Sequence, residues 1–192
     1  MFLNILVCGD SFAADWGNAQ GWTDFLGAKH TITNMAQAGV SEYKILKQVE
    51  SVNWQKFDCT IIAHTSMSRV HIDQHPLHKT TQLHSNCDLI YNDLVESRSK
   101  DPAVQAGIDY FKHIYDPVYY RDIYRLILDR IGELCVKPTL HMTFFDNPVE
   151  YPFVCLQLKS VFSRFPGNNN HLNAEGNIKI SKLVEEWIEN VY

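Results

Sequence analysis

The chain has 192 residues, of which 45% are hydrophobic and 20% charged, and its formal net charge is −5. This length suits one domain with a sizeable core, and this composition is typical of a soluble globular protein. Because lysines and arginines form no cluster, nucleic acid and anionic membrane surfaces are not expected as partners. No apolar run approaches the roughly 20 residues that a membrane-spanning helix needs.

The N-terminal residues and the cysteines indicate a cytoplasmic protein. The apolar run that starts at Phe2 follows no positive charge and is too short for a secretory signal. The five cysteines are odd in number, scattered along the chain and without a Cys-x-x-Cys pair, a pattern typical of reduced thiols. We therefore expect free cysteines rather than a disulfide framework.

The first half of the chain alternates apolar strands with short helices. The predicted elements are a buried strand over 2–8, a helix over 20–28, a weaker strand over 31–35, a helix that Ser41 caps, and a buried strand within 57–66. The turn Gly9-Asp10-Ser11 follows the first strand, and a glycine turn at Gly39 follows the second.

The second half opens with a long connection over about 66–100 that has no clear period. Connections of this length often form lids or binding loops. The elements predicted after it are helices that start at Asp101-Pro102 and Asp116-Pro117, a strand over 138–145, a weak strand within 153–158, and a helix from about Ala174. Repeats and linkers are absent from the sequence, so we expect one domain over 1–192.

Strands that alternate with helices in this way predict an α/β fold. The expected architecture is a three-layer α/β/α sandwich with a mostly parallel, flavodoxin-like sheet of five strands. The strand over 2–8 is expected near the centre, because its residues are apolar without alternation. Ligands of such sheets bind outside the carboxyl ends of the strands. The turns after the first three strands therefore predict one site at one edge.

Three sequence blocks in this order resemble the SGNH/GDSL hydrolases. They are Gly-Asp-Ser at 9–11, "NMAQAGVS" at 34–41, and "NNNHLNAEGN" at 168–177. The resemblance runs along residues 2–192 and agrees with the predicted fold. It implies a serine esterase that works through an acyl-enzyme.

The resemblance also assigns roles to individual residues. Ser11 matches the nucleophile, and His171 matches the general base that takes its proton and returns it to the leaving alcohol. The backbone N–H groups of Ser11 and Gly39 match the oxyanion hole. The alternatives are that Ser11 is an ordinary turn or capping serine, and that Gly39 serves only a positive φ angle.

The third block of the family is altered in this chain. The family has Gly-x-Asn-Asp there, and the Asn side chain completes the oxyanion hole. This chain has "AHTSMSR" at 63–69, which aligns Met67 with that Asn, and a thioether cannot donate a hydrogen bond. Among the hydroxyls of Thr65, Ser66 and Ser68, we choose Ser66 as the substitute donor. The alternative is that these hydroxyls only cap the turn.

The acid of the family's Asp-x-x-His motif is also replaced, here by Asn168. A neutral amide still accepts the second N–H of the His171 imidazole and fixes its tautomer, but it lacks the charge that stabilises the imidazolium. A backbone carbonyl of the loop is the other candidate for this role. We therefore expect modest activity.

Two further groups of residues have alternative interpretations. His71, His75 and His78 would meet at a metal only on a helix, and Pro76 argues against one, so we expect a solvated loop and no metal. The aromatic stretch over 110–126 either belongs to the core or lines an acyl or sugar pocket.

The function that these observations favour is hydrolysis of small acyl esters, expected to be acetyl esters, of an alcohol or a carbohydrate, with no cofactor. One alternative is an SGNH-fold protein that binds a carbohydrate or acyl ligand without hydrolysing it. Another is an acyltransferase that passes the acyl group to an alcohol. A flavodoxin-like cofactor site is discounted because the sequence has no Gly-rich phosphate loop. The oligomeric state stays open.

Overall fold

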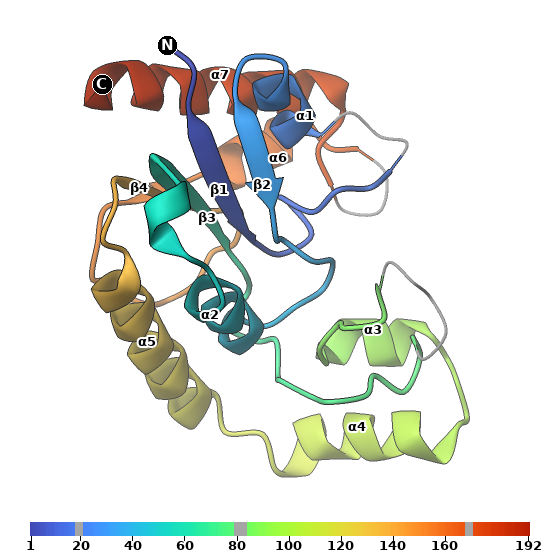
Figure 1. Cartoon of the computed structure of the whole chain (residues 1–192). Coiled ribbons are helices and arrows are strands. Elements are labelled where there is room, and N and C mark those ends of the chain that lie inside the picture. The colour runs from blue at the N-terminus through green and yellow to red at the C-terminus, as the bar shows by residue number, and fades with distance from the viewer. Residues whose placement is uncertain (18–20, 79–83, 168–170) are drawn as a thin grey trace.

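The computed structural model describes residues 1–17, 21–78, 84–167 and 171–192. Within these ranges it has one five-stranded sheet in the order β2-β1-β3-β4-β5, parallel throughout (Figure 1). The strands are β1 (Asn4–Gly9), β2 (Thr31–Asn34), β3 (Cys59–His64), β4 (Thr139–Thr143) and β5 (Cys155–Gln157). The predicted α/β class and five-stranded sheet are confirmed, and β1 is an interior strand beside the central β3.

Helices cover both faces of this sheet, which confirms the predicted three layers. The helices are α1 (Trp22–Gly27), α2 (Glu42–Glu50), α3 (Tyr91–Glu96), α4 (Pro102–His113), α5 (Pro117–Leu134), α6 (Lys159–Arg164) and α7 (Ala174–Val191), with a 3₁₀ turn η1 at Trp54–Lys56. One core joins α1, α6 and α7 to the sheet, and a second core joins α2 and α5 to its other face.

The two cores follow from the alternation of side chains along a strand. In β1, Ile5 and Val7 point into the core beneath α1 and α7, while Leu6 and Cys8 point into the core beneath α2 and α5. All four side chains are fully buried. A strand that is buried on both faces reads as a continuous apolar run, which is why the sequence predicted its place in the interior of the sheet.

The capping predictions have different outcomes. Asp101 and Asp116 cap α4 and α5 as predicted, because a carboxylate oxygen of each accepts hydrogen bonds from backbone N–H groups in the first turn. Ser41 occupies the N-cap of α2, but its hydroxyl makes no capping hydrogen bond. Its backbone N–H instead donates to the Asp88 carboxylate, with 2.6 Å between N and Oδ2.

The long connection after β3 has structure of its own. Val70 and Leu89 form an antiparallel bridge, and both belong to a small core between α3 and α4 that is separate from the cores of the sheet. Figure 1 shows α3 and α4 beyond the end of the sheet towards which the strands point. That end is the carboxyl edge, where the sequence predicts the site.

The described helices and cysteines answer two other predictions. None of the helices in the described ranges combines the length and apolarity needed to cross a membrane. All five cysteines are free thiols, as predicted, and Cys8, Cys59 and Cys87 are buried. Burial raises the pKa of Cys8 and of Cys59 to about 12, so both thiols stay protonated and are poor nucleophiles near neutral pH.

Candidate active site

The carboxyl edge of the sheet gathers the predicted site residues because β2, β1 and β3 are parallel neighbours. Ser11 lies in the turn after β1, Gly39 in the turn after β2, and Ser66 in the turn after β3. His171 lies just before α7. Ser11 is half-buried, which leaves its side chain partly accessible at this edge.

The residues before Ser11 are held tightly. A Cβ atom on Gly9 would come within 2.7 Å of the Ala63 carbonyl oxygen, so this position has no room for a side chain. The buried Gln48 amide makes two hydrogen bonds with the backbone of Gly9. The Gly9 N–H donates to Gln48 Oε1 at 2.7 Å, and Gln48 Nε2 donates to the Gly9 carbonyl at 3.1 Å. The glycine before the serine therefore allows β1 to end against β3 and be fastened to α2.

Asp10 shapes the turn that carries Ser11. Its Oδ1 accepts a hydrogen bond from the Phe12 N–H at 3.0 Å, and its carbonyl accepts from the N–H groups of Ala13 and Ala14. The carboxyl group is fully buried. Burial raises the pKa of Asp10 from 3.8 to about 6, against the opposing effects of the Phe12 hydrogen bond and the Arg69 charge.

This shift predicts a pH-dependent stability that Asp10→Asn removes. The folded protein binds more protons than the unfolded chain between about pH 4 and about pH 6, so the contribution of Asp10 to stability falls as the pH rises through that range. The full penalty above pH 6 is about 3 kcal/mol, from a shift of about two pKa units. The stability of Asp10→Asn relative to the wild type should therefore increase from pH 4 to pH 7 in urea unfolding. A difference that stays constant with pH would contradict this account.

Trp16 connects His171 to the turn of Ser11. The indole Nε1 of Trp16 donates a hydrogen bond to the Ser11 carbonyl at 3.0 Å, and its ring packs edge-on against the His171 imidazole with 4.5 Å between centroids. The Phe12 ring lies 5.3 Å from the same imidazole. His171 and Ser11 thus share two aromatic neighbours, although they are 160 positions apart in the sequence.

Backbone contacts among the described residues on either side of 168–170 hold His171 in place. The Gly167 N–H donates to the His171 carbonyl at 2.6 Å, and Pro166 forms an antiparallel bridge with Leu172. A Cβ atom on Gly167 would come within 2.7 Å of the Leu172 backbone, so only glycine fits there. Asn168, the residue predicted to hold the imidazole, lies outside the described residues, and its hydrogen bond to His171 stays a prediction.

Gly39 has the backbone conformation that its turn requires. Its φ angle is +73°, in the left-handed region that favours glycine, and a Cβ atom there would come within 2.7 Å of the Cys87 Cβ. Its carbonyl accepts a hydrogen bond from the Asp88 N–H at 2.8 Å. These features explain the glycine without a ligand and are equally compatible with a role in an oxyanion hole.

The three candidate hydroxyls of the turn after β3 differ in burial, and Ser68 is the exposed one. Thr65 is fully buried, and Met67 packs with Tyr124 in a small apolar cluster. Ser66 is half-buried, and its Oγ accepts a hydrogen bond from the Ser68 N–H at 3.3 Å. A hydroxyl that accepts one hydrogen bond still has its own proton to donate. Ser66 therefore keeps the chemistry that the predicted third donor needs.

Arg69 is a candidate functional residue that our sequence reasoning missed. Its Nη1 lies 3.6 Å from the point that a Cβ on Gly39 would occupy, and it contacts the Asp88 carbonyl at 3.4 Å. The Arg69 charge also lowers the pKa of Asp10. A cation beside the predicted oxyanion glycine is well placed to stabilise negative charge. The only signal in the sequence was an arginine at the end of the polar run after β3.

A buried polar chain supports the end of β3 and was also missed. The Glu42 carboxylate contacts His64 Nδ1 at 2.7 Å, and His64 Nε2 contacts His141 Nδ1 at 3.0 Å. The second oxygen of Glu42 accepts from the Thr65 N–H at 3.2 Å. Burial, with the nearby His64, lowers the pKa of His141 to about 3, so this imidazole is neutral at physiological pH. The chain fixes the backbone that leads to Ser66.

A groove at this edge is lined by Trp16 and residues near it, and not by Ser11 or Gly39 themselves. Its volume is about 460 Å³, and it is lined by residues 14–17 and 36–38 together with Ser85 and Asn86. Pockets for small molecules begin at roughly 300 Å³. The groove is therefore large enough for a short acyl group with part of its alcohol.

The three histidines of the long connection differ in how far they follow the prediction of a solvated loop. His71 is exposed and contacts Asp88, but His75 is only 2% exposed and its ring lies tilted against that of His78 with 4.7 Å between centroids. The prediction of a solvated loop is therefore wrong for His75. The reasoning that only a helix brings these side chains together overlooked a folded loop, which places His75 and His78 next to Cys87.

Comparisons with known proteins neither support nor contradict the resemblance to a family. No family model matches the chain, and no curated protein matches it as a relative. The resemblance to the SGNH/GDSL hydrolases therefore stays a prediction from three sequence blocks.

Proposed function

We propose that this chain is a serine esterase of the SGNH/GDSL type that removes small acyl groups, acetyl foremost, from an alcohol or a carbohydrate. One observation carries the proposal: Trp16 binds the Ser11 carbonyl and packs on the His171 ring, which supports a working pair of nucleophile and base. The groove lined by Trp16 has room for a small substrate. The free thiols support a reducing compartment such as the cytoplasm.

The proposed reaction uses this edge in two steps. In the first, Ser11 Oγ attacks the ester carbonyl while His171 takes its proton, and collapse of the tetrahedral intermediate expels the alcohol, which recovers that proton from His171. In the second, His171 activates a water that hydrolyses the acyl-enzyme and frees Ser11. We expect Ser11 Oγ and a ring nitrogen of His171 to lie within about 4 Å of each other.

Stabilisation of the oxyanion is the other requirement. The backbone N–H groups of Ser11 and Gly39 are the proposed donors, and each such donor is worth about 3 kcal/mol in the transition state. The Ser66 hydroxyl is the proposed third donor. The Arg69 guanidinium beside Gly39 adds a positive charge that strengthens the same site.

Two alternative functions would use the same candidate site. An acyltransferase would form the same acyl-enzyme and pass the acyl group to an alcohol instead of water. A binding protein with a relict site would hold a carbohydrate or acyl ligand without turnover. A substitution at Asn168 can distinguish the esterase from the binding protein, because this residue occupies the position of the family's catalytic acid.

We predict that Asn168→Asp raises kcat/KM for p-nitrophenyl acetate at neutral pH by at least about tenfold. The reason is that a carboxylate stabilises the His171 imidazolium, and loss of that charge costs about 10⁴-fold in a serine protease. Ser11→Ala is the blank, and Asn190→Asp on α7 controls for the change in net charge. Activity at the level of the blank in both the wild type and Asn168→Asp would favour the binding protein.

A further inference from the structure

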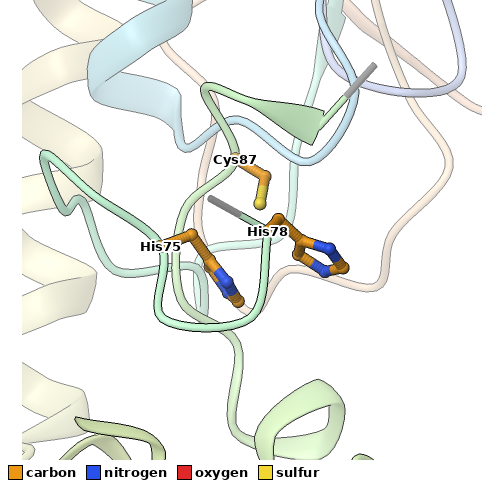
Figure 2. A group of neighbouring side chains, drawn as sticks. All are labelled: His75, His78 and Cys87. Carbon is orange, nitrogen blue, oxygen red and sulfur yellow. The ribbon is translucent and has the colours of Figure 1, made fainter. Parts of the chain in front are cut away.

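His75, His78 and Cys87 form a cluster of metal-ligating side chains in the connection between β3 and α3 (Figure 2). One potential ligand atom from each residue lies within 4.8 Å of the other two. His75 and Cys87 are buried, and His78 is half-buried. Imidazole nitrogens and a cysteine sulfur are the ligands that zinc prefers in proteins.

The spacing of these atoms is close to that of a zinc site. Bond lengths of roughly 2.0–2.3 Å place the ligand atoms of a tetrahedral zinc about 3.3–3.8 Å apart. The separations of up to 4.8 Å therefore have to shrink by about 1 Å. The three residues come from two loop segments outside any helix or strand, so a shift of the loops together with side-chain rotation would have to close this gap.

The His75 imidazole supplies a second, independent observation. Its Nε2 is buried and has no hydrogen-bond partner among the described residues, while its Nδ1 accepts from the Leu77 N–H at 3.1 Å. An unpartnered nitrogen in the interior costs free energy, which a metal ion bound at Nε2 would recover. The ring proton would then sit on Nδ1, which could no longer accept from the Leu77 N–H, so this hydrogen bond would be lost on binding.

The surroundings favour a thiolate-binding metal over a hard cation. The trio has no carboxylate, and the nearby Arg69 and Lys44 are positive, with Asp88 as the opposing charge. A dication held only by neutral ligands would be repelled there, whereas binding to Cys87 replaces its S–H proton with the metal and adds a negative charge. His84 stacks on His78 at 5.1 Å between centroids and lies beside the cluster.

We propose that His75, His78 and Cys87 bind one zinc-class divalent ion. Such an ion would cross-link the segment of His75 and His78 to that of Cys87. Because Cys87 packs against Gly39, the ion would also help to fix the turn that contains Gly39. The proposal does not depend on esterase activity, and its test reads metal binding directly.

Titration with Co²⁺, monitored by absorption, tests this site. We expect the wild type to take up one equivalent, with a thiolate-to-cobalt charge-transfer band and the visible bands of tetrahedral cobalt, and to release it to Zn²⁺. Cys87→Ser should abolish the charge-transfer band, and His78→Gln should weaken binding by at least about 100-fold. Circular dichroism of each apo-variant checks that it folds.

Two variants serve as matched controls. Cys135→Ser removes a half-buried free cysteine elsewhere, and His71→Ala removes the histidine of the same connection that contacts Asp88 instead of the cluster. Both should bind Co²⁺ as the wild type does. A wild type without the charge-transfer band, or a band that survives Cys87→Ser or disappears in Cys135→Ser, would overturn the proposal.

Discussion

Replacing Ser11 by alanine is expected to lower kcat/KM for p-nitrophenyl acetate by at least about 10³-fold. The variant keeps the turn, because Asp10 and Gly9 make its fixing hydrogen bonds, but it has no oxygen to form the acyl-enzyme. His171→Ala should cost nearly as much, since an unassisted hydroxyl is a weak nucleophile.

The double variant, Ser11→Ala with His171→Ala, tests the pair more directly than either single change. If Ser11 and His171 act as one unit, removing both should cost little more than removing one. Ser163→Ala, which changes an exposed serine on α6, is the matched control and should leave the rate unchanged. Activity that persists in Ser11→Ala would mean that another group is the nucleophile.

Replacing Asp88 by alanine is expected to lower the free energy of unfolding by about 3–5 kcal/mol. The Asp88 side chain is fully buried, accepts hydrogen bonds from the N–H groups of Ser41 and Ile72, and pairs with Lys44 at 2.8 Å. Alanine leaves a nearly buried ammonium group and two N–H groups without their carboxylate. These contacts fasten the long connection to α2, so its loss should loosen the carboxyl edge of the sheet.

Urea unfolding of Asp88→Ala measures this effect. Asp109→Ala, at an exposed position on α4, is the matched control and should change the stability by less than about 0.5 kcal/mol. Combining Asp88→Leu with Lys44→Met removes both charges and should recover part of the loss. A loss below about 1 kcal/mol in Asp88→Ala would show that the ion pair does not anchor the connection.

The sheet was predictable because its signals are local. The apolar run that became β1 and the Asp-Pro pairs that cap α4 and α5 each indicate their structure within a few residues. The helices α3 and α6 were missed because each is short and begins after an apolar residue, Ile90 or Leu158, instead of a capping residue. The connection that contains α3 is shaped by the small core that it shares with α4.

The candidate site was predictable from the fold pattern where it follows the ends of strands, whereas His171 was assigned by the resemblance alone. Ser11, Gly39 and Ser66 lie at one edge because parallel neighbouring strands end there. The contacts of Glu42 with His64, and of His75 with Cys87, join residues that are 22 and 12 positions apart and have no fixed spacing. Such contacts depend on how loops pack, which no local pattern in the sequence records.

Labelling with a fluorophosphonate probe tests the central proposal most directly. An activated serine oxygen displaces fluoride and forms a stable phosphonate ester, whereas an ordinary turn serine does not react. We predict one adduct, mapped by mass spectrometry to Ser11 of the folded protein and absent from both His171→Ala and Ser11→Ala. No adduct on the folded wild type, or an adduct at Ser11 that His171→Ala retains in full, would contradict an activated pair of Ser11 and His171.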